Sequence, residues 1–190
     1  MSDVLGENAV NYYSKESAKL YELSGAFKRI QESMAIDALS LSDFKKNDLI
    51  LDLGCGTGFS LNVLIKKGFK AVGIDVSFEM LAHAKNKGLI VACADMKNLP
   101  FKDESFDGLI SISAIQWEAP ENYGLMLDEI RRVIKNSAII QFYPKEKAEF
   151  ECFIKLSEKK FEIVEVFSVG EGVKEKKYVR MIKQCKGRKA

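Results

Sequence analysis

Apolar runs with the length of strands alternate along this chain with segments whose apolar residues recur at helical spacing. The predicted strands cover 49–53, 70–75, 89–94, 105–113, 137–143, 161–168 and 176–183. The predicted helices cover 27–41, 59–67, 77–87, 123–134 and 145–159, and 11–23 is a short helix or an extended cover. Because apolar strands separated by helices form parallel sheets buried on both faces, we expect an α/β fold.

The length and composition are those of one domain. The chain has 190 residues, 47% of them hydrophobic, and a net charge of +2 that gives no overall argument for a nucleic-acid partner. We expect residues 1–190 to form a single domain, with 11–47 as an N-terminal helical cover and 174–190 as a basic last strand and tail. From Lys174 onward there are eight Lys or Arg residues and one Glu. Such a segment suits a polyanionic partner, or it is a solvated strand with a frayed end.

The cysteines and the N-terminus exclude several other classes of protein. Cys55, Cys93, Cys152 and Cys185 are scattered without a CxxC motif, so we expect neither a zinc site nor a disulfide framework. The N-terminus is polar, and no apolar run has the length needed to span a bilayer. These features predict a soluble intracellular protein with reduced thiols and no metal site.

A glycine-rich turn, DLGCGTG at 52–58, leaves the first predicted strand and enters a helix. Glycines permit a tight turn and close approach of the backbone to a ligand. Asp75 ends the second strand, where a carboxylate can accept hydrogen bonds from both ribose hydroxyls of a nucleoside. Asp95 and Met96 end the third strand, where a carboxylate and a backbone amide can bind an adenine edge. Alternatively, Asp75 is a charge at a helix N-terminus and Asp95 is a turn residue.

Acidic strand ends around a glycine loop fit S-adenosylmethionine, which has no pyrophosphate. A nicotinamide dinucleotide would require the loop to meet phosphates at the helix N-terminus. In this interpretation Asp52 orients the loop or the methionine amino group. The predicted cofactor residues from the loop and the strand ends are Asp52, Gly54, Cys55, Gly56, Asp75, Val76, Asp95 and Met96.

The last two predicted strands indicate that the sheet is not wholly parallel. Only a glycine-rich turn at 170–172 separates them, so one of them must run antiparallel to the other. The expected result is a seven-stranded, mostly parallel sheet with the last strand antiparallel and helices on both faces. This layout is similar to the class I methyltransferase fold, which is Rossmann-like.

Four motifs make the resemblance more specific: LDLGCGTGFS at 51–60, GIDVSFEML at 73–81, FDGLISISAIQW at 106–117 and QFYP at 141–144. Together with Tyr21, Arg29-Ile30-Gln31 and Met34, they resemble the eukaryotic 18S rRNA (guanine-N(7)) methyltransferase family over about residues 11–183. The chain departs from the family pattern in lacking an Arg near Ala26, in carrying Glu118 where an apolar residue is expected, and in its shorter basic C-terminal extension.

The resemblance implies that the fourth strand ends where the methyl group emerges, with Ser111 near the cofactor. Gln116 and Trp117 would then line the acceptor side, and Tyr143 and Pro144 would form its other wall. Alternatively, Trp117 and Tyr143 are core aromatics and Gln116 is a loop amide. Guanine N(7) has a lone pair and no proton, so its methylation needs alignment and exclusion of water but no general base.

The predicted sheet order leaves the third strand at one edge, and its apolar run LIVACA at 89–94 invites pairing with another strand. The family resembled here works with a small zinc-binding activator protein that adds a strand to that edge. The predicted partner edge therefore consists of Leu89, Ile90, Val91 and Ala92. Alternatively, the chain's own N-terminal segment covers the edge.

The leading prediction is an enzyme that methylates small-subunit rRNA with S-adenosylmethionine during ribosome biogenesis. The resemblance implies contact with pre-ribosomes and a location in the nucleus, the nucleolus and the cytoplasm. One alternative is a small-molecule methyltransferase of the same fold. Another is a ribosome-assembly scaffold for which catalysis is dispensable.

Overall fold

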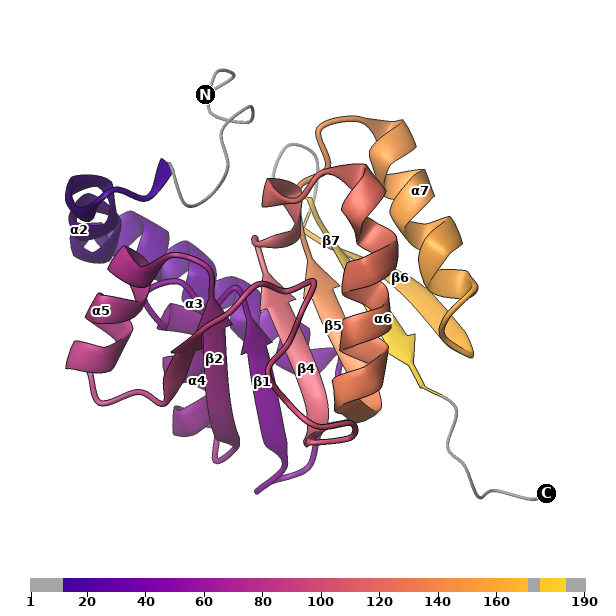
Figure 1. Cartoon of the computed structure of the whole chain (residues 1–190), viewed down its shortest axis with the longest axis horizontal. Coiled ribbons are helices and arrows are strands. Elements are labelled where there is room, and N and C mark those ends of the chain that lie inside the picture. Colours follow the sequence, from indigo (N-terminus) through magenta and orange to yellow (C-terminus); the bar gives the residue numbers. More distant parts are fainter. Residues whose placement is uncertain (1–11, 171–174, 184–190) are drawn as a thin grey trace.

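A single seven-stranded sheet organises residues 12–170 and 175–183, the part of the chain that the computed structural model describes. The strand order is β3-β2-β1-β4-β5-β7-β6. β7 runs antiparallel to both of its neighbours, and the other neighbouring strands pair in parallel (Figure 1). The strand bounds are Leu49–Leu53 (β1), Lys70–Asp75 (β2), Val91–Cys93 (β3), Phe106–Ile112 (β4), Ile134–Gln141 (β5), Ile163–Val169 (β6) and Lys176–Ile182 (β7). The predicted class I methyltransferase architecture is confirmed.

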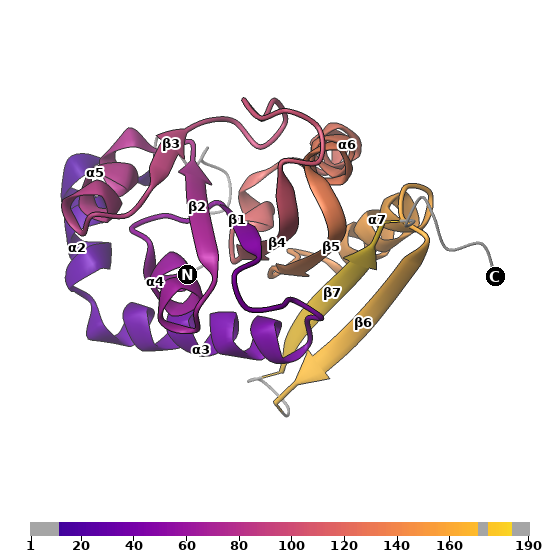
Figure 2. The same ribbon diagram turned by 90° about the horizontal axis from the view of Figure 1, so that it is seen from below.

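Helices cover both faces of the sheet (Figure 2). Ile50 of β1 packs in the cluster formed with α3, α4 and α5, whereas its neighbour Leu51 packs in the cluster formed with α6 and α7. This alternation is the reason for the continuous apolar runs in the sequence. The helix bounds are Lys15–Leu23 (α2), Gly25–Ser40 (α3), Phe59–Lys66 (α4), Phe78–Asn86 (α5), Tyr123–Val133 (α6) and Lys147–Glu158 (α7), with 3₁₀ turns at Ile115–Trp117 (η2) and Pro120–Asn122 (η3).

The structure shifts three of the predicted elements. The N-terminal cover consists of two helices, because the Ser24 hydroxyl accepts a hydrogen bond from the Phe27 N–H at 3.2 Å and starts α3 earlier than predicted. β3 is only three residues long, and Leu89 lies before it in the core. β5 begins at Ile134, directly after α6, and ends at Gln141, so Tyr143 lies beyond the strand.

Two predicted features lie wholly or partly outside the described residues: the turn at 170–172 and the tail that follows β7. Across 12–170 and 175–183, none of the helices is long and apolar enough to cross a membrane. The same residues contain no cluster of three His, Cys, Asp or Glu side chains that could hold a metal ion.

Candidate active site

A pocket lies at the carboxyl ends of β1, β2 and β3, beside the end of β4, and Tyr21 of α2 is among its lining residues. Most of the predicted cofactor residues line it, namely Gly54, Cys55, Gly56, Asp75, Val76, Asp95 and Met96. Asp52 and Ser111 are fully buried behind the lining. The fold therefore gathers into one pocket the glycine loop and two acidic strand ends that the sequence keeps apart.

The glycine loop is bonded to β2 and passes close to the turn after β4. The N–H groups of Gly54 and Cys55 both donate to the carbonyl of Ile74, at 2.9 and 2.8 Å. Gly54 has a φ of 77°, and a Cβ at this position would lie 2.2 Å from the Cβ of Ala114. Only glycine fits both constraints, so the backbone of the loop itself forms part of the pocket wall.

Asp75 joins the glycine loop to the start of α5. Its Oδ2 accepts from the N–H of Gly56 at 2.9 Å, and its Oδ1 accepts from the N–H of Ser77 at 2.8 Å. Each oxygen keeps a further lone pair for a ligand. Burial raises the pKa of Asp75, although these backbone hydrogen bonds oppose the rise. The Ser77 hydroxyl caps α5 by accepting from the N–H of Met80 at 3.3 Å.

Asp52 lies at the end of β1, beneath the loop. Its Oδ2 accepts from the hydroxyl of Ser60 at 2.6 Å, and Ser60 lines the pocket. Its Oδ1 is buried without a hydrogen-bond partner among the described residues. Burial raises the pKa of Asp52 to about 7, against the hydrogen bond from Ser60. An unpaired buried carboxylate oxygen is costly, which indicates that a cationic or hydrogen-bonding group of a ligand belongs near it.

The contacts of Ser111 and Cys55 are structural. The Ser111 hydroxyl donates to the carbonyl of Leu53 at 2.8 Å, which ties β4 to β1 below the pocket. Burial raises the pKa of the Cys55 thiol, and the carboxylates of Asp52 and Asp75 add to the rise. Cys55 is therefore a neutral side chain of the wall.

Aromatic residues of the N-terminal segment cover the pocket, and pattern reasoning did not identify them as a group. The Tyr13 ring lies 5.5 Å from Trp117 in a T-shaped arrangement, and Tyr12 lies 5.1 Å from the same indole. Tyr21 stacks on Phe59 of α4 at 5.7 Å. Burial raises the pKa of Tyr13 and of Tyr21, so both hydroxyls stay neutral. The Tyr12-Tyr13 pair directly before a helix cap was the available sequence signal.

The predicted acceptor residues are only partly brought together. Trp117 lines the pocket, whereas Gln116 does not, because its Nε2 donates to the carbonyl of Ser113 at 2.9 Å. Tyr143 and Pro144 line a separate, shallow hollow near the start of α7. The Tyr143 hydroxyl contacts the sulfur of Met34 at 3.4 Å. The aromatic rings that lie against Trp117 are those of Tyr12 and Tyr13.

Lys97 links two loops of the pocket wall, a role that its position two residues after Asp95 does not predict. Its ammonium lies 2.8 and 2.9 Å from the two carboxylate oxygens of Glu118 and 3.0 Å from Asp95. Burial raises the pKa of Asp95, but the hydrogen bonds and the charge of Lys97 outweigh it and the net shift is downward. Asn122 also donates to Glu118, at 3.0 Å.

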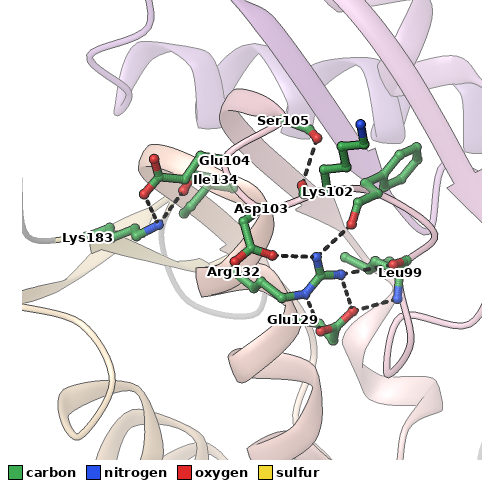
Figure 3. Close-up of polar contacts among 10 residues, drawn as sticks. Leu99, Lys102, Asp103, Glu104, Ser105, Glu129, Arg132, Ile134 and Lys183 are labelled. Atoms are coloured by element: carbon green, nitrogen blue, oxygen red, sulfur yellow. Dashed lines mark hydrogen bonds and ion pairs between the residues drawn. The ribbon is translucent and has the colours of Figure 1, made fainter.

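A second charged cluster lies outside the pocket lining (Figure 3). The Arg132 guanidinium of α6 holds Glu129 at 2.7 and 2.8 Å, Asp103 at 3.0 Å and the carbonyl oxygens of Leu99 and Phe101 at 2.9 and 2.6 Å. It thereby fastens the segment that leads from β3 to β4 against α6.

The edge at β3 carries part of the predicted partner surface. The backbone carbonyl of Ile90 accepts from the N–H of Gly73, and the N–H of Ala94 donates to the backbone carbonyl of Asp75. The backbone groups of Val91 and Cys93 therefore point away from β2. Leu89 and Ala92 pack against the core, whereas the Ile90 side chain is 68% exposed. α2 packs against α5, where Glu22 pairs with Lys87 at 2.7 Å.

The comparisons with known proteins agree with the class defined by the fold: this chain has the class I methyltransferase fold. Residues 51–142 match the family model described as Methyltransferase domain. Magnesium protoporphyrin IX methyltransferase from Synechocystis, with bound SAH, aligns with a TM-score of 0.71 at 14% identity, over 93% of this chain and 98% of that chain. A structure described as a complex between the Haloferax volcanii Trm112 methyltransferase activator and the putative methyltransferase aligns with a TM-score of 0.60 at 22% identity, over 79% and 77%.

The predicted resemblance to 18S rRNA (guanine-N(7)) methyltransferases is confirmed by curated relatives. The enzyme bud23 of Schizosaccharomyces pombe is 32% identical over 149 residues, 70% of this chain and 56% of that protein. The Saccharomyces cerevisiae enzyme is 34% identical over 149 residues, 70% and 54%. The malonyl-[acyl-carrier protein] O-methyltransferase of Hamiltonella defensa is 31% identical over 140 residues, 73% and 52%. The chain thus spans about half the length of the curated relatives it matches.

Proposed function

We propose that this protein is an S-adenosylmethionine-dependent methyltransferase that methylates the N(7) atom of a guanine in small-subunit rRNA. The observation that carries the proposal is a pocket in which every carboxylate of the lining is already engaged and an indole lies beside the cofactor residues. Asp75 is held by backbone N–H groups, and Asp95 and Glu118 are held by Lys97. Such a site suits an acceptor that has a lone pair and no proton to lose.

The residues present fit the cofactor. The spare lone pairs of Asp75 suit the ribose hydroxyls. The unpaired Oδ1 of Asp52 and the hydroxyl of Ser60, which lines the pocket, suit a methionine ammonium. When bound, S-adenosylmethionine supplies an electrophilic methyl group on a sulfonium sulfur. The protein's own contribution is to orient the ligands and to exclude water, which the N-terminal tyrosines favour by covering the pocket.

The residues on the proposed acceptor side of the pocket favour a nucleobase over a carboxylate as the methyl acceptor. Trp117 offers a flat apolar surface for stacking, which contributes about 1–3 kcal/mol per base in comparable sites. A free carboxylate acceptor would need a cation, and Lys97, the cation of the described lining, already directs its three N–H groups to Asp95 and Glu118. A guanine in RNA would be unstacked to enter the pocket.

We further propose that a small zinc-binding activator protein pairs with β3. The outward-facing backbone groups of Val91 and Cys93 and the exposed Ile90 are the features that such a strand would use. A structurally similar methyltransferase has been solved in complex with a methyltransferase activator, which supports a partner of this kind. An activity in ribosome assembly would place the complex in the nucleus or nucleolus and in the cytoplasm.

The test is methyl transfer to RNA. The chain, co-expressed with the activator candidate, is incubated with methyl-labelled S-adenosylmethionine and either small-subunit rRNA or isolated pre-ribosomal particles, and the RNA is then cleaved chemically at N(7)-methylguanine. One strong cleavage site is the expected result. A malonyl-carrier conjugate is offered in a parallel incubation, and label in that conjugate but not in RNA would overturn the proposed acceptor. Particle binding and maturation that persist without any transfer would indicate a scaffold.

A further inference from the structure

Two loops of the pocket lining are joined by the side chain of Lys97. One loop follows β3 and carries Asp95, which faces the pocket on the side proposed for the adenine. The other is the turn of η2 and η3 after β4, and it carries Trp117 and Glu118. Lys97 belongs to the first loop and reaches Glu118 of the second at 2.8 Å. The contact therefore joins the proposed cofactor half of the pocket to the proposed acceptor half.

The geometry leaves the Lys97 ammonium saturated. Its three N–H groups face three carboxylate oxygens, two of Glu118 and one of Asp95. The side chains of Lys97 and Glu118 are only 25% and 16% exposed, so water screens the pair less than it would a surface pair. Asn122 holds Glu118 from the other side. The carboxylate next to Trp117 is thus fixed from two directions.

We propose that Lys97 is a positioning residue that fixes the two halves of the pocket relative to each other. It holds Asp95 for the adenine of the cofactor and, through Glu118, it holds Trp117 for the acceptor base. This inference rests on the proposed function, because it assumes which ligand occupies each half. Its effect is to make the cofactor half and the acceptor half depend on one ion-pair network.

The test is a double-mutant cycle on the binding of S-adenosylhomocysteine to the full chain, measured by calorimetry. Lys97→Met is expected to weaken binding about tenfold, which corresponds to about 1.4 kcal/mol. Glu118→Gln is expected to weaken it less, because Asp95 keeps its lysine. The double variant should bind within about twofold of Lys97→Met, since both changes remove the same contact. Lys135→Met is the matched control, because this lysine pairs with Asp107 at 2.8 Å near the opposite end of β4.

A second readout concerns the acceptor half and needs no ligand. Trp117 is the only tryptophan of the chain, so acrylamide quenching of its fluorescence reports how tightly the turn is held. Quenching should increase in Lys97→Met and in Glu118→Gln but not in Lys135→Met. Unchanged S-adenosylhomocysteine affinity in Lys97→Met would overturn the proposal that Lys97 positions the cofactor half, and so would a double variant in which the two single effects multiply. Unchanged quenching would overturn the proposal that Lys97 positions the acceptor half. Absence of binding by the unmodified chain would contradict the proposed cofactor, while the quenching experiment would still test Lys97.

Discussion

Two charged clusters, one around Lys97 and one around Arg132, use the same chemistry for different purposes. Both cations are saturated, Lys97 by three acceptors and Arg132 by five. Lys97 binds only side chains that line the pocket, whereas Arg132 binds backbone carbonyls and carboxylates outside the lining (Figure 3). The partners of each cation, and not its number of hydrogen bonds, indicate whether a cluster serves the pocket or the fold.

The difference also follows from the side chains themselves. A planar guanidinium with five donors can hold several carbonyl groups of one loop at fixed angles, which suits a permanent fastening. A lysine ammonium is a compact charge on a flexible stem, which lets one side chain reach carboxylates on two separate loops. We therefore expect changes in the pocket to alter binding with little effect on stability, and changes around Arg132 to do the reverse.

The largest effect on binding is expected from Asp75→Asn. The new amide can accept from only one of the Gly56 and Ser77 N–H groups, because its NH2 then faces the other. It also weakens the hydrogen bonds to the ribose, so the affinity for S-adenosylhomocysteine should fall about 100-fold, or about 2.7 kcal/mol. Calorimetry gives the affinity, and the thermal midpoint shows whether the fold is retained. Asp128→Asn, at an exposed ion pair with Lys160, is the control and should bind normally. Near-normal binding by Asp75→Asn would remove this residue from the cofactor site.

The Arg132 cluster gives the opposite expectation. Arg132→Met removes five hydrogen bonds and leaves Glu129 without its cation, although Glu129 still accepts from the Leu99 N–H. Because the Arg132 side chain is 29% exposed, we expect a loss of only about 2 kcal/mol in the free energy of unfolding. Urea unfolding measures this loss, and S-adenosylhomocysteine affinity should change by less than about twofold below the transition. A large loss of affinity in a folded Arg132→Met protein would contradict the separation of the two clusters.

Trp117→Ala tests whether the acceptor half of the pocket acts separately from the cofactor half. Loss of the stacking surface should lower kcat/KM for RNA methylation about tenfold, or about 1.4 kcal/mol, while the affinity for S-adenosylhomocysteine changes little. Steady-state kinetics with varied RNA measures the first quantity and calorimetry the second. Trp117→Phe keeps a flat ring and should retain most of the activity. Equal losses of RNA methylation and cofactor affinity would place Trp117 in the cofactor half.

The smallest effect concerns pH. Burial raises the pKa of Asp52 to about 7 in the folded ligand-free protein, above its value in the unfolded chain. The folded state therefore keeps a proton that the unfolded state has lost, and this contribution to stability declines as pH rises through about 7. Relative to Asp52→Asn, the thermal midpoint of the unmodified protein should fall by a few degrees, on the order of 1 kcal/mol, between pH 5 and pH 8. Scanning calorimetry measures the difference, and parallel curves would exclude a titrating Asp52.

Local chemistry explains why so much of the fold was predictable from the sequence. Ile50 and Leu51 are both buried, on opposite faces of the sheet, so a continuous apolar run encodes a central parallel strand. Gly54 and Asp75 lie at strand ends, and the carboxyl ends of parallel strands meet at one edge of the sheet. The positions of the glycine loop and of both acidic strand ends therefore followed from the order of the elements.

The tertiary structure alone decided which side chains complete the pocket. The N-terminal cover folds back so that Tyr13 meets Trp117, a contact across more than a hundred residues that no local pattern encodes. β5 starts early and ends at Gln141, which leaves Tyr143 and Pro144 in a separate hollow. Lys97 meets Glu118 only because two loops converge above the sheet. Spacing along the chain fixes the ends of strands, whereas the packing of loops and helices on those ends fixes their partners.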